Sequence, residues 1–165
     1  DQLSNACVSA GARCQVYPRL LREALARRGA FEVDLLVDAR PFHDPAAGFL
    51  IKHIGEHPEN LARMAGHHHF PKWIRSLRRA VRQLLDSRGT ARVAVYCKSG
   101  KHRSVAAAWF LRHLGELEGW VSMVSHLSQH AWGRTCQGKC QQCRPGPSEL
   151  RAHALQAAIS HSMEF

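Results

Sequence analysis

One short stretch constrains the fold of this chain more than any other: an apolar strand pattern that leads through a basic loop into a helix. Val93–Tyr96 has the composition of a buried strand, and Arg103–Leu114 is an alanine-rich segment with the pattern of a buried helix. The loop between them is Cys97-Lys98-Ser99-Gly100-Lys101-His102-Arg103-Ser104. This succession predicts an α/β protein with the loop at the end of a strand.

The other segments also alternate between strand and helix patterns. Strands are predicted over Val33–Asp38 and Trp120–Val124, and no element is assigned to residues 1–17. Helices are predicted over 18–28, 59–64, 71–88 and 148–159, whereas most of the span from 42 to 70 is an irregular loop. We therefore predict one α/β domain over residues 1–165, with a small parallel or mixed sheet flanked by helices on both faces.

The loop has the residues that hold a phosphate group. Backbone N–H groups that curl toward a helix start attract an anion, and Gly100 allows the backbone to approach closely. Arg103 can bind two phosphate oxygens at once, which a lysine does less well. The predicted ligand-binding residues of the loop are Lys98, Ser99, Gly100, Lys101, His102, Arg103 and Ser104.

A catalytic interpretation of the same loop is also open. Cys97, five residues, Arg103 and then Ser104 match the spacing of the cysteine-dependent phosphatases, in which the cysteine is the nucleophile. Such an enzyme needs a general acid, for which Asp38 and Asp44 are the candidates. Asp38 could instead hold a neighbouring arginine in place, and we favour that structural role. The alternative is that this segment is an ordinary strand–turn–helix with a buried cysteine, and that the loop has no functional role.

The charge of the chain points to polyanionic partners. Lysine and arginine total 23 against 13 acidic residues, a formal net charge of +10, with 12 histidines in addition. Four arginines recur on one face of the predicted helix from Pro71, and we predict a nucleic-acid surface there: Arg75, Arg78, Arg79 and Arg82. A solvated basic face is the alternative. The longest purely apolar run, Val105–Leu111, is far too short to span a membrane, so no membrane partner is expected.

Three of the six cysteines lie close together in a Cys/His-rich loop over 126–146. Cys136, Cys140 and Cys143 have the spacing of zinc ligands, with His130 as the first choice for the fourth ligand and His126 as the second. Four such ligands would close the site, which predicts a structural zinc ion. Free surface thiols, or a redox pair of Cys140 and Cys143, are the alternatives. This cysteine pattern favours a reducing, intracellular compartment, cytoplasmic or nuclear.

Three consecutive histidines, His67-His68-His69, are a second candidate metal site. Adjacent residues on a short loop do not readily direct three imidazoles at one ion. We therefore interpret them as a solvated or phosphate-facing cluster.

Two segments together resemble the C-terminal domain of the bacterial RNase adapter protein RapZ. They are Val37–Pro45, with its Asp-Ala-Arg sequence, and Cys97–Val105, with its His-Arg-Ser-Val sequence, and the resemblance spans roughly 34 to 126. Ser99 stands where that family has glycine, and the cysteine cluster is not part of the family pattern. The matching positions are Asp38, Arg40, Cys97, Gly100, His102, Arg103 and Ser104.

The resemblance implies an α/β domain that binds the phosphate groups of RNA and of an amino-sugar phosphate, without established phosphatase chemistry. It adds Arg40 to the expected ligand-binding residues. We therefore expect RNA or a phosphorylated metabolite to bind through the Cys97–Ser104 loop, with a cysteine-dependent phosphatase as the alternative.

Overall fold

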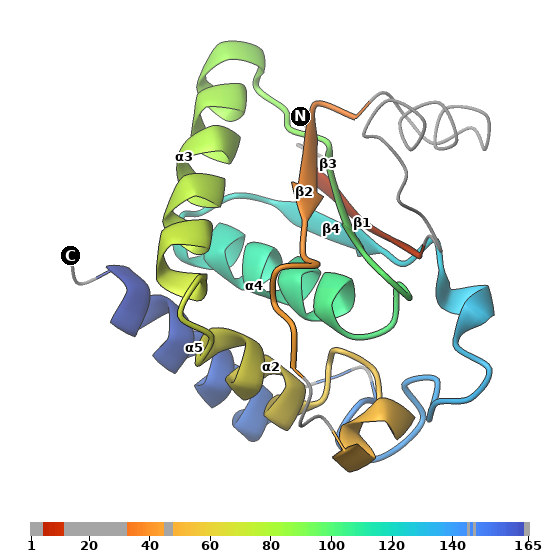
Figure 1. The fold of residues 1–165 in the computed structure, drawn as a ribbon. Coiled ribbons are helices and arrows are strands. Elements are labelled where there is room, and N and C mark those ends of the chain that lie inside the picture. Colours follow the sequence, from red (N-terminus) through yellow and green to blue (C-terminus); the bar gives the residue numbers. More distant parts are fainter. Residues whose placement is uncertain (1–4, 12–32, 45–47, 145, 147, 164–165) are drawn as a thin grey trace.

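The computed structural model describes residues 5–11, 33–44, 48–144, 146 and 148–163 (Figure 1). Within them, four strands form one sheet in the order β2-β3-β1-β4, and every neighbouring pair is parallel. The strands are β1 (Asn5–Gly11), β2 (Leu35–Asp38), β3 (Val93–Cys97) and β4 (Ser122–Ser125). The prediction of an α/β fold with a small parallel sheet is confirmed.

Strand β1 is the element that the sequence patterns missed. It lies between β3 and β4, with Cys7 opposite Val93 on one side and opposite Val124 on the other. The first segment of the chain therefore completes the centre of the sheet. The helix predicted over 18–28 lies outside the described residues.

The register of the sheet brings two chemically important residues to the same edge. Asp38 at the end of β2 is opposite Tyr96, and Cys97 is the last residue of β3. All five residues of β3 are buried, as expected for an inner strand of a parallel sheet. Because carboxyl ends of parallel strands meet at one edge, Asp38 and the loop after Cys97 lie near each other.

The helices agree with the predicted ones to within a few residues at each end. They are α2 (Pro58–Ala65), α3 (Phe70–Arg88), α4 (Arg103–Leu117) and α5 (Glu149–Met163), with short 3-10 helices at η1 (Gly48–Lys52) and η2 (Gln129–Ala131). Helix α3 is followed by Gly89, whose φ of 70° is a conformation that favours glycine. The Gly89 N–H donates to the carbonyl oxygen of Leu85 and caps the helix.

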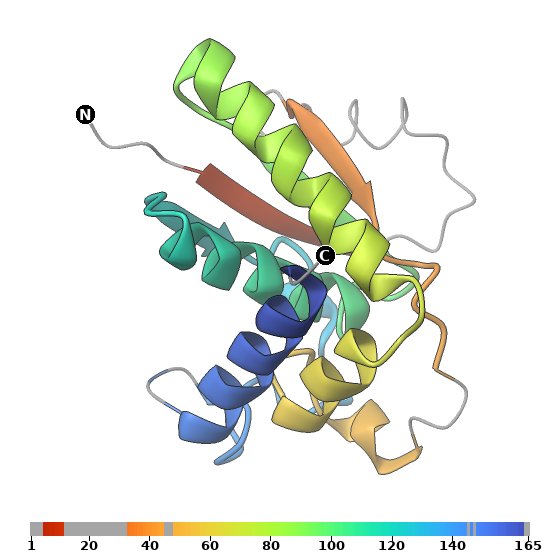
Figure 2. The same cartoon turned by 90° about the vertical axis from the view of Figure 1, so that its left-hand side faces the viewer.

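Helices α3 and α4 lie on the same side of the sheet, and α5 packs across α2, α3 and α4 (Figures 1 and 2). The described helices gather on this side, so helices on both faces of the sheet remain a prediction. The inner face of α3 buries Ile74, Leu77 and Val81 against the same core as β3 and α4. In the described part of the chain, no helix has the length and apolar character needed to cross a membrane.

Candidate functional site

The loop between β3 and α4 curls around the sulfur of Cys97. The Cys97 side chain is 1% exposed; its Sγ accepts a hydrogen bond from the Gly100 N–H at 3.3 Å and lies 3.2 Å from Ser104 Oγ. Ser104 is fully buried in the first turn of α4. The structure thus brings together the cysteine and the serine at the two ends of the motif, with the backbone of the loop wrapped between them.

Gly100 is the turning point of this loop. Its φ is 65°, which a residue with a side chain adopts only with strain. Its carbonyl oxygen accepts hydrogen bonds from Ser128 Oγ at 2.7 Å and from Trp132 Nε1 at 2.9 Å, both buried side chains. The loop is therefore held from the side of η2, and its backbone conformation is fixed by donors outside the motif.

Arg103 opens α4 and is positioned by the end of β2. One of its guanidinium N–H groups donates to the carbonyl oxygen of Arg40 at 2.8 Å. The rest of the guanidinium makes no hydrogen bond to any described residue, and Arg103 lines a cavity beside the loop. It therefore keeps donors available for an anion.

Asp38 binds Arg40 rather than Arg103. The Arg40 guanidinium donates to both carboxylate oxygens of Asp38, at 2.7 to 3.0 Å, and it also lies over the ring of Tyr96. Burial alone would raise the pKa of Asp38, but the hydrogen bonds from Arg40 outweigh it and the pKa is lowered. Asp38 is thus a carboxylate at neutral pH, in the structural role that we favoured.

The cavity beside the loop has a volume of about 460 Å³. Arg103, His102 and Ala106 line it from α4 and its start. Helix α2 and the segments on either side of it provide the other walls: Phe42, His43, Asp44, Leu50, Ile51, Asn60, Arg63, Met64, Gly66 and His67. Asp44, the second candidate acid, is bound by Arg63 through both carboxylate oxygens, at 2.5 and 2.8 Å. Both acidic residues proposed for catalysis are therefore paired with an arginine.

Only one residue of the histidine triplet faces this cavity. His67 lines it, whereas His68 and His69 are exposed. The three ring centroids lie 3.9 to 5.2 Å apart; the rings of His67 and His68 stack, and the ring of His69 is tilted against both. Burial, together with the two neighbouring histidines, lowers the pKa of His67, which favours its neutral form.

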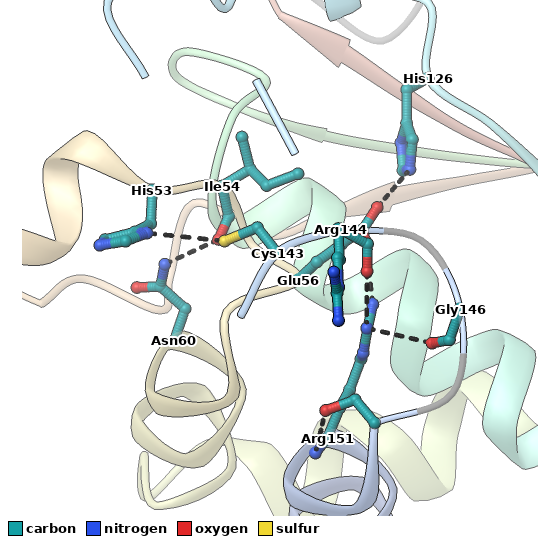
Figure 3. A network of polar contacts seen from close by, with 10 residues as sticks. His53, Ile54, Glu56, Asn60, His126, Cys143, Arg144, Gly146 and Arg151 are labelled. Atoms are coloured by element: carbon teal, nitrogen blue, oxygen red, sulfur yellow. Dashed lines mark hydrogen bonds and ion pairs between the residues drawn. The ribbon is translucent and has the colours of Figure 1, made fainter. Parts of the chain in front are cut away.

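A second cluster lies behind the loop, where the three predicted cysteines do come together. Each residue of one set offers one ligand atom, and these four atoms lie within 4.8 Å of one another: Cys136, Cys140, Cys143 and His53. His53 Nδ1 is 3.4 Å from Cys140 Sγ and 3.6 Å from Cys143 Sγ. Figure 3 shows the contact with Cys143. These residues can hold a metal ion.

The fourth group of this cluster is His53, and the sequence-based choices for that place were wrong. His130 is exposed, with Nδ1 3.1 Å from the carbonyl oxygen of Leu127, and His126 faces Glu56 across 3.7 Å. His53 lies in the irregular segment after η1, 87 residues before Cys140. Because no local spacing connects such distant residues, only the three-dimensional arrangement could identify it.

The part of the chain that contains the loop matches a known protein family. A model of the RapZ C-terminal domain matches residues 26–130, which is most of the chain and includes β2, the loop and α4. The chain belongs to the RapZ C-terminal domain family. No curated protein matches the chain.

The boundary of this family match divides the cluster of three cysteines and one histidine. His53 lies inside the matched residues, whereas the three cysteines follow position 130. The cysteine segment therefore lies outside the matched residues, while its cysteines lie close to His53 within them.

The basic face predicted on α3 is partly neutralised. Arg78 and Arg82 both bind the carboxylate of Glu118, and Arg75 donates to the carbonyl oxygen of Ser162 at 2.9 Å. Arg79 is exposed. The four arginines do share a helix, but the charge that they present to solvent is smaller than their number indicates.

Proposed function

We propose that this RapZ C-terminal domain recognises phosphate groups through the Cys97–Ser104 loop, in RNA or in a phosphorylated metabolite. The observation that carries the proposal is the position of Arg103. Its guanidinium is oriented by one hydrogen bond to Arg40 and lines a cavity at the start of α4, where backbone N–H groups favour an anion. An arginine held in this way is suited to charge-assisted, bidentate binding of a phosphate.

The cavity supports a ligand with an organic part beside the phosphate. Small-molecule sites typically have volumes of about 300–1,000 Å³, and this one, at about 460 Å³, combines apolar walls with Arg103, His43 and Asn60. A phosphorylated small molecule, or the terminal nucleotide of an RNA, would fit such a site.

Titration calorimetry with inorganic phosphate and phenyl phosphate tests the proposal. Since a hydrogen bond to a charged group contributes about 1.5–3 kcal/mol, Arg103→Ala should weaken binding by about 10- to 100-fold. Arg103→Lys should recover only part of the affinity, because lysine keeps the charge without the bidentate geometry. Arg79→Ala is the charge-matched control and should leave phosphate binding unchanged. Equal affinities in Arg103→Ala and the control would refute the proposal.

The alternative function, a cysteine-dependent phosphatase, is favoured by one observation. The Cys97 sulfur lies within hydrogen-bond distance of Ser104 and the Gly100 N–H, two groups that stabilise a thiolate. The paired states of Asp38 and Asp44 weigh against it, because neither is placed as a free proton donor. Hydrolysis of an aryl phosphate that disappears in Cys97→Ser would establish the enzyme; binding without turnover would favour recognition alone.

We further propose that the ion at the four-residue cluster is a structural zinc. Zn–S and Zn–N distances of about 2.3 and 2.05 Å give a tetrahedron whose N–S edge is about 3.6 Å, close to the 3.4 and 3.6 Å between His53 Nδ1 and the two sulfurs. Burial, followed by the proximity of His57, lowers the pKa of His53 and favours the neutral imidazole that metals bind. Four protein ligands would leave no open position for catalysis. Elemental analysis of the purified chain would identify the metal.

A further inference from the structure

The segment around His53 lies between the metal-binding cluster and the phosphate loop. On one side, the His53 imidazole lies 3.4 Å from the sulfur of Cys140 and 3.6 Å from that of Cys143, the second of which is drawn in Figure 3. On the other side, the carbonyl oxygen of the same residue lies 2.9 Å from Nε2 of His102 in the loop. One residue thus contacts both sites, through its side chain and its backbone.

At Gly55, the backbone of this segment lies directly against the backbone of the loop. Its N–H donates to the carbonyl oxygen of Lys101 at 2.8 Å. A Cβ atom at this position would lie 2.1 Å from the carbonyl oxygen of His102 and 2.4 Å from the amide nitrogen of Ala106. Because the backbones touch without an intervening side chain, a displacement of residues 53–55 must displace the loop or the first turn of α4.

The cysteine segment reaches the loop by a second route. Trp132, whose indole N–H donates to Gly100, is buried in a small cluster of its own with Ile54, Val105 and Cys143. This cluster is separate from the main core between the sheet and the helices. The side chain of Cys143 therefore packs directly among the residues that surround the loop.

Little regular structure holds these two segments in place. Within the described residues, 126–146 contains only the three-residue helix η2, and the backbone hydrogen bond from Cys136 to Lys52, at 2.7 Å, is one of the few that join it to the His53 segment. A metal ion bound by one histidine and three cysteines would cross-link the two segments. Binding energy at such a site is also folding energy for the segments that supply its ligands.

We propose that the metal held by His53, Cys136, Cys140 and Cys143 fixes the Cys97–Ser104 loop in its ligand-binding conformation, so that metal occupancy controls the affinity for phosphate. This proposal rests on the proposed function of the loop for its ligand, but the order of the loop can be measured without any ligand. His53 is a positioning residue in this scheme, since it acts on the loop through its backbone.

Hydrogen exchange measured by mass spectrometry on the full chain tests the proposal. The zinc-loaded protein is compared with protein stripped by a chelator and with stripped protein to which Zn²⁺ is returned. Peptides covering 97–106 should exchange faster after stripping, while those covering α3 stay unchanged. If metal loss leaves about a tenth of the loops competent, the affinity for inorganic phosphate falls about tenfold. Returning zinc should restore both the slow hydrogen exchange of the loop and the affinity for phosphate.

A pair of histidine variants distinguishes the loss of metal coordination from a general loss of structure. His53→Ala should behave like stripped protein even when zinc is present. His130→Ala removes an exposed histidine of the same cysteine segment that is not among the four clustered groups, so it should behave like the wild type. His53→Cys keeps a ligand atom and the backbone carbonyl, and it should restore loop protection.

Gly55→Ala provides a test that leaves every metal ligand in place. It should retain zinc and lose phosphate affinity, because its methyl group pushes the His53 segment away from the loop. Loop exchange that is the same with and without zinc, absence of zinc binding, or full phosphate affinity in Gly55→Ala would each overturn the proposal. If the zinc-loaded protein shows a zinc-ordered loop but binds no phosphate, the proposed function fails while the coupling stands.

Discussion

A buried ion pair between Glu56 and Arg151 anchors the segment that follows His53 to α5, and breaking it should unfold the domain at a much lower temperature. The Arg151 and Glu56 side chains are only 4% and 8% exposed, and their charged atoms lie 3.0 Å apart. Arg151 also donates to the carbonyl oxygens of Arg144 and Gly146, directly after the last cysteine (Figure 3). One guanidinium thus satisfies a buried carboxylate and two backbone acceptors.

The expected cost of Arg151→Met follows from this geometry. Removing one partner of a buried ion pair typically costs about 3–5 kcal/mol, because the other charge stays buried without compensation. His126 still faces Glu56 across 3.7 Å, so we expect the lower half of that range. For a domain of this size, such a loss lowers Tm by on the order of 10 °C.

Thermal and urea unfolding of zinc-loaded protein measure this loss. Arg112→Met is the matched control, because Arg112 also lies over the Trp109 ring but pairs with Glu116 on an exposed helix face. Arg112→Met should lower the free energy of unfolding by about 0.5 kcal/mol or less. Adding Glu56→Gln to Arg151→Met should recover stability, since it removes the uncompensated charge. A change of less than about 1 kcal/mol in Arg151→Met would refute the reasoning, because it falls well below the cost of an uncompensated buried charge.

Two further predictions concern charges near the proposed ligand surfaces. Because the folded-state pKa of Asp38 is lowered, its ion pair with Arg40 should stabilise the fold above the ordinary pKa of 3.8 and lose this contribution as pH falls further. The stability difference between wild type and Asp38→Asn should therefore shrink below that pH, and a difference independent of pH would contradict the assignment. Glu118→Gln should release the two arginines that it binds on α3. If this face contacts RNA, filter binding at several salt concentrations should show a higher affinity and a steeper salt dependence; unchanged values would place RNA elsewhere.

Local patterns in the sequence were sufficient to predict most of the fold and the three cysteines of the Cys/His cluster. The strand, loop and helix around Cys97 and the long helix α3 follow from apolar periodicity and end signals, and the three cysteines follow from their spacing. Strand β1 could not be predicted in this way. Asn5–Gly11 has Val8 as its single β-branched residue, so its strand conformation depends on pairing with β3 and β4, which are distant in sequence.

His53 could not be predicted for the same physical reason, since its partners are distant in sequence. Its imidazole meets the cysteines only because the chain folds back over many residues, and neither the spacing nor the composition around it reports that contact. The irregular span from 42 to 70 was the one usable signal, since long loops inside compact domains are often functional. Gly55, where the backbone of this span touches the loop, is understandable only from the structure.

The balance of charges around the loop explains why recognition is a better interpretation than turnover. Asp38 and Asp44, the two acids considered for catalysis, are each bound by an arginine, and these two pairs leave no net charge. Lys98, Lys101 and Arg103 have no ion pair with any described carboxylate, so the loop presents an excess of positive charge. Phosphoryl transfer from a monoester needs a proton donor for the leaving group as well as a site for the phosphate. In the proposed function the loop would supply the site for the phosphate, while the two candidate proton donors are each held by an arginine. This arrangement favours recognition of a phosphate over its hydrolysis.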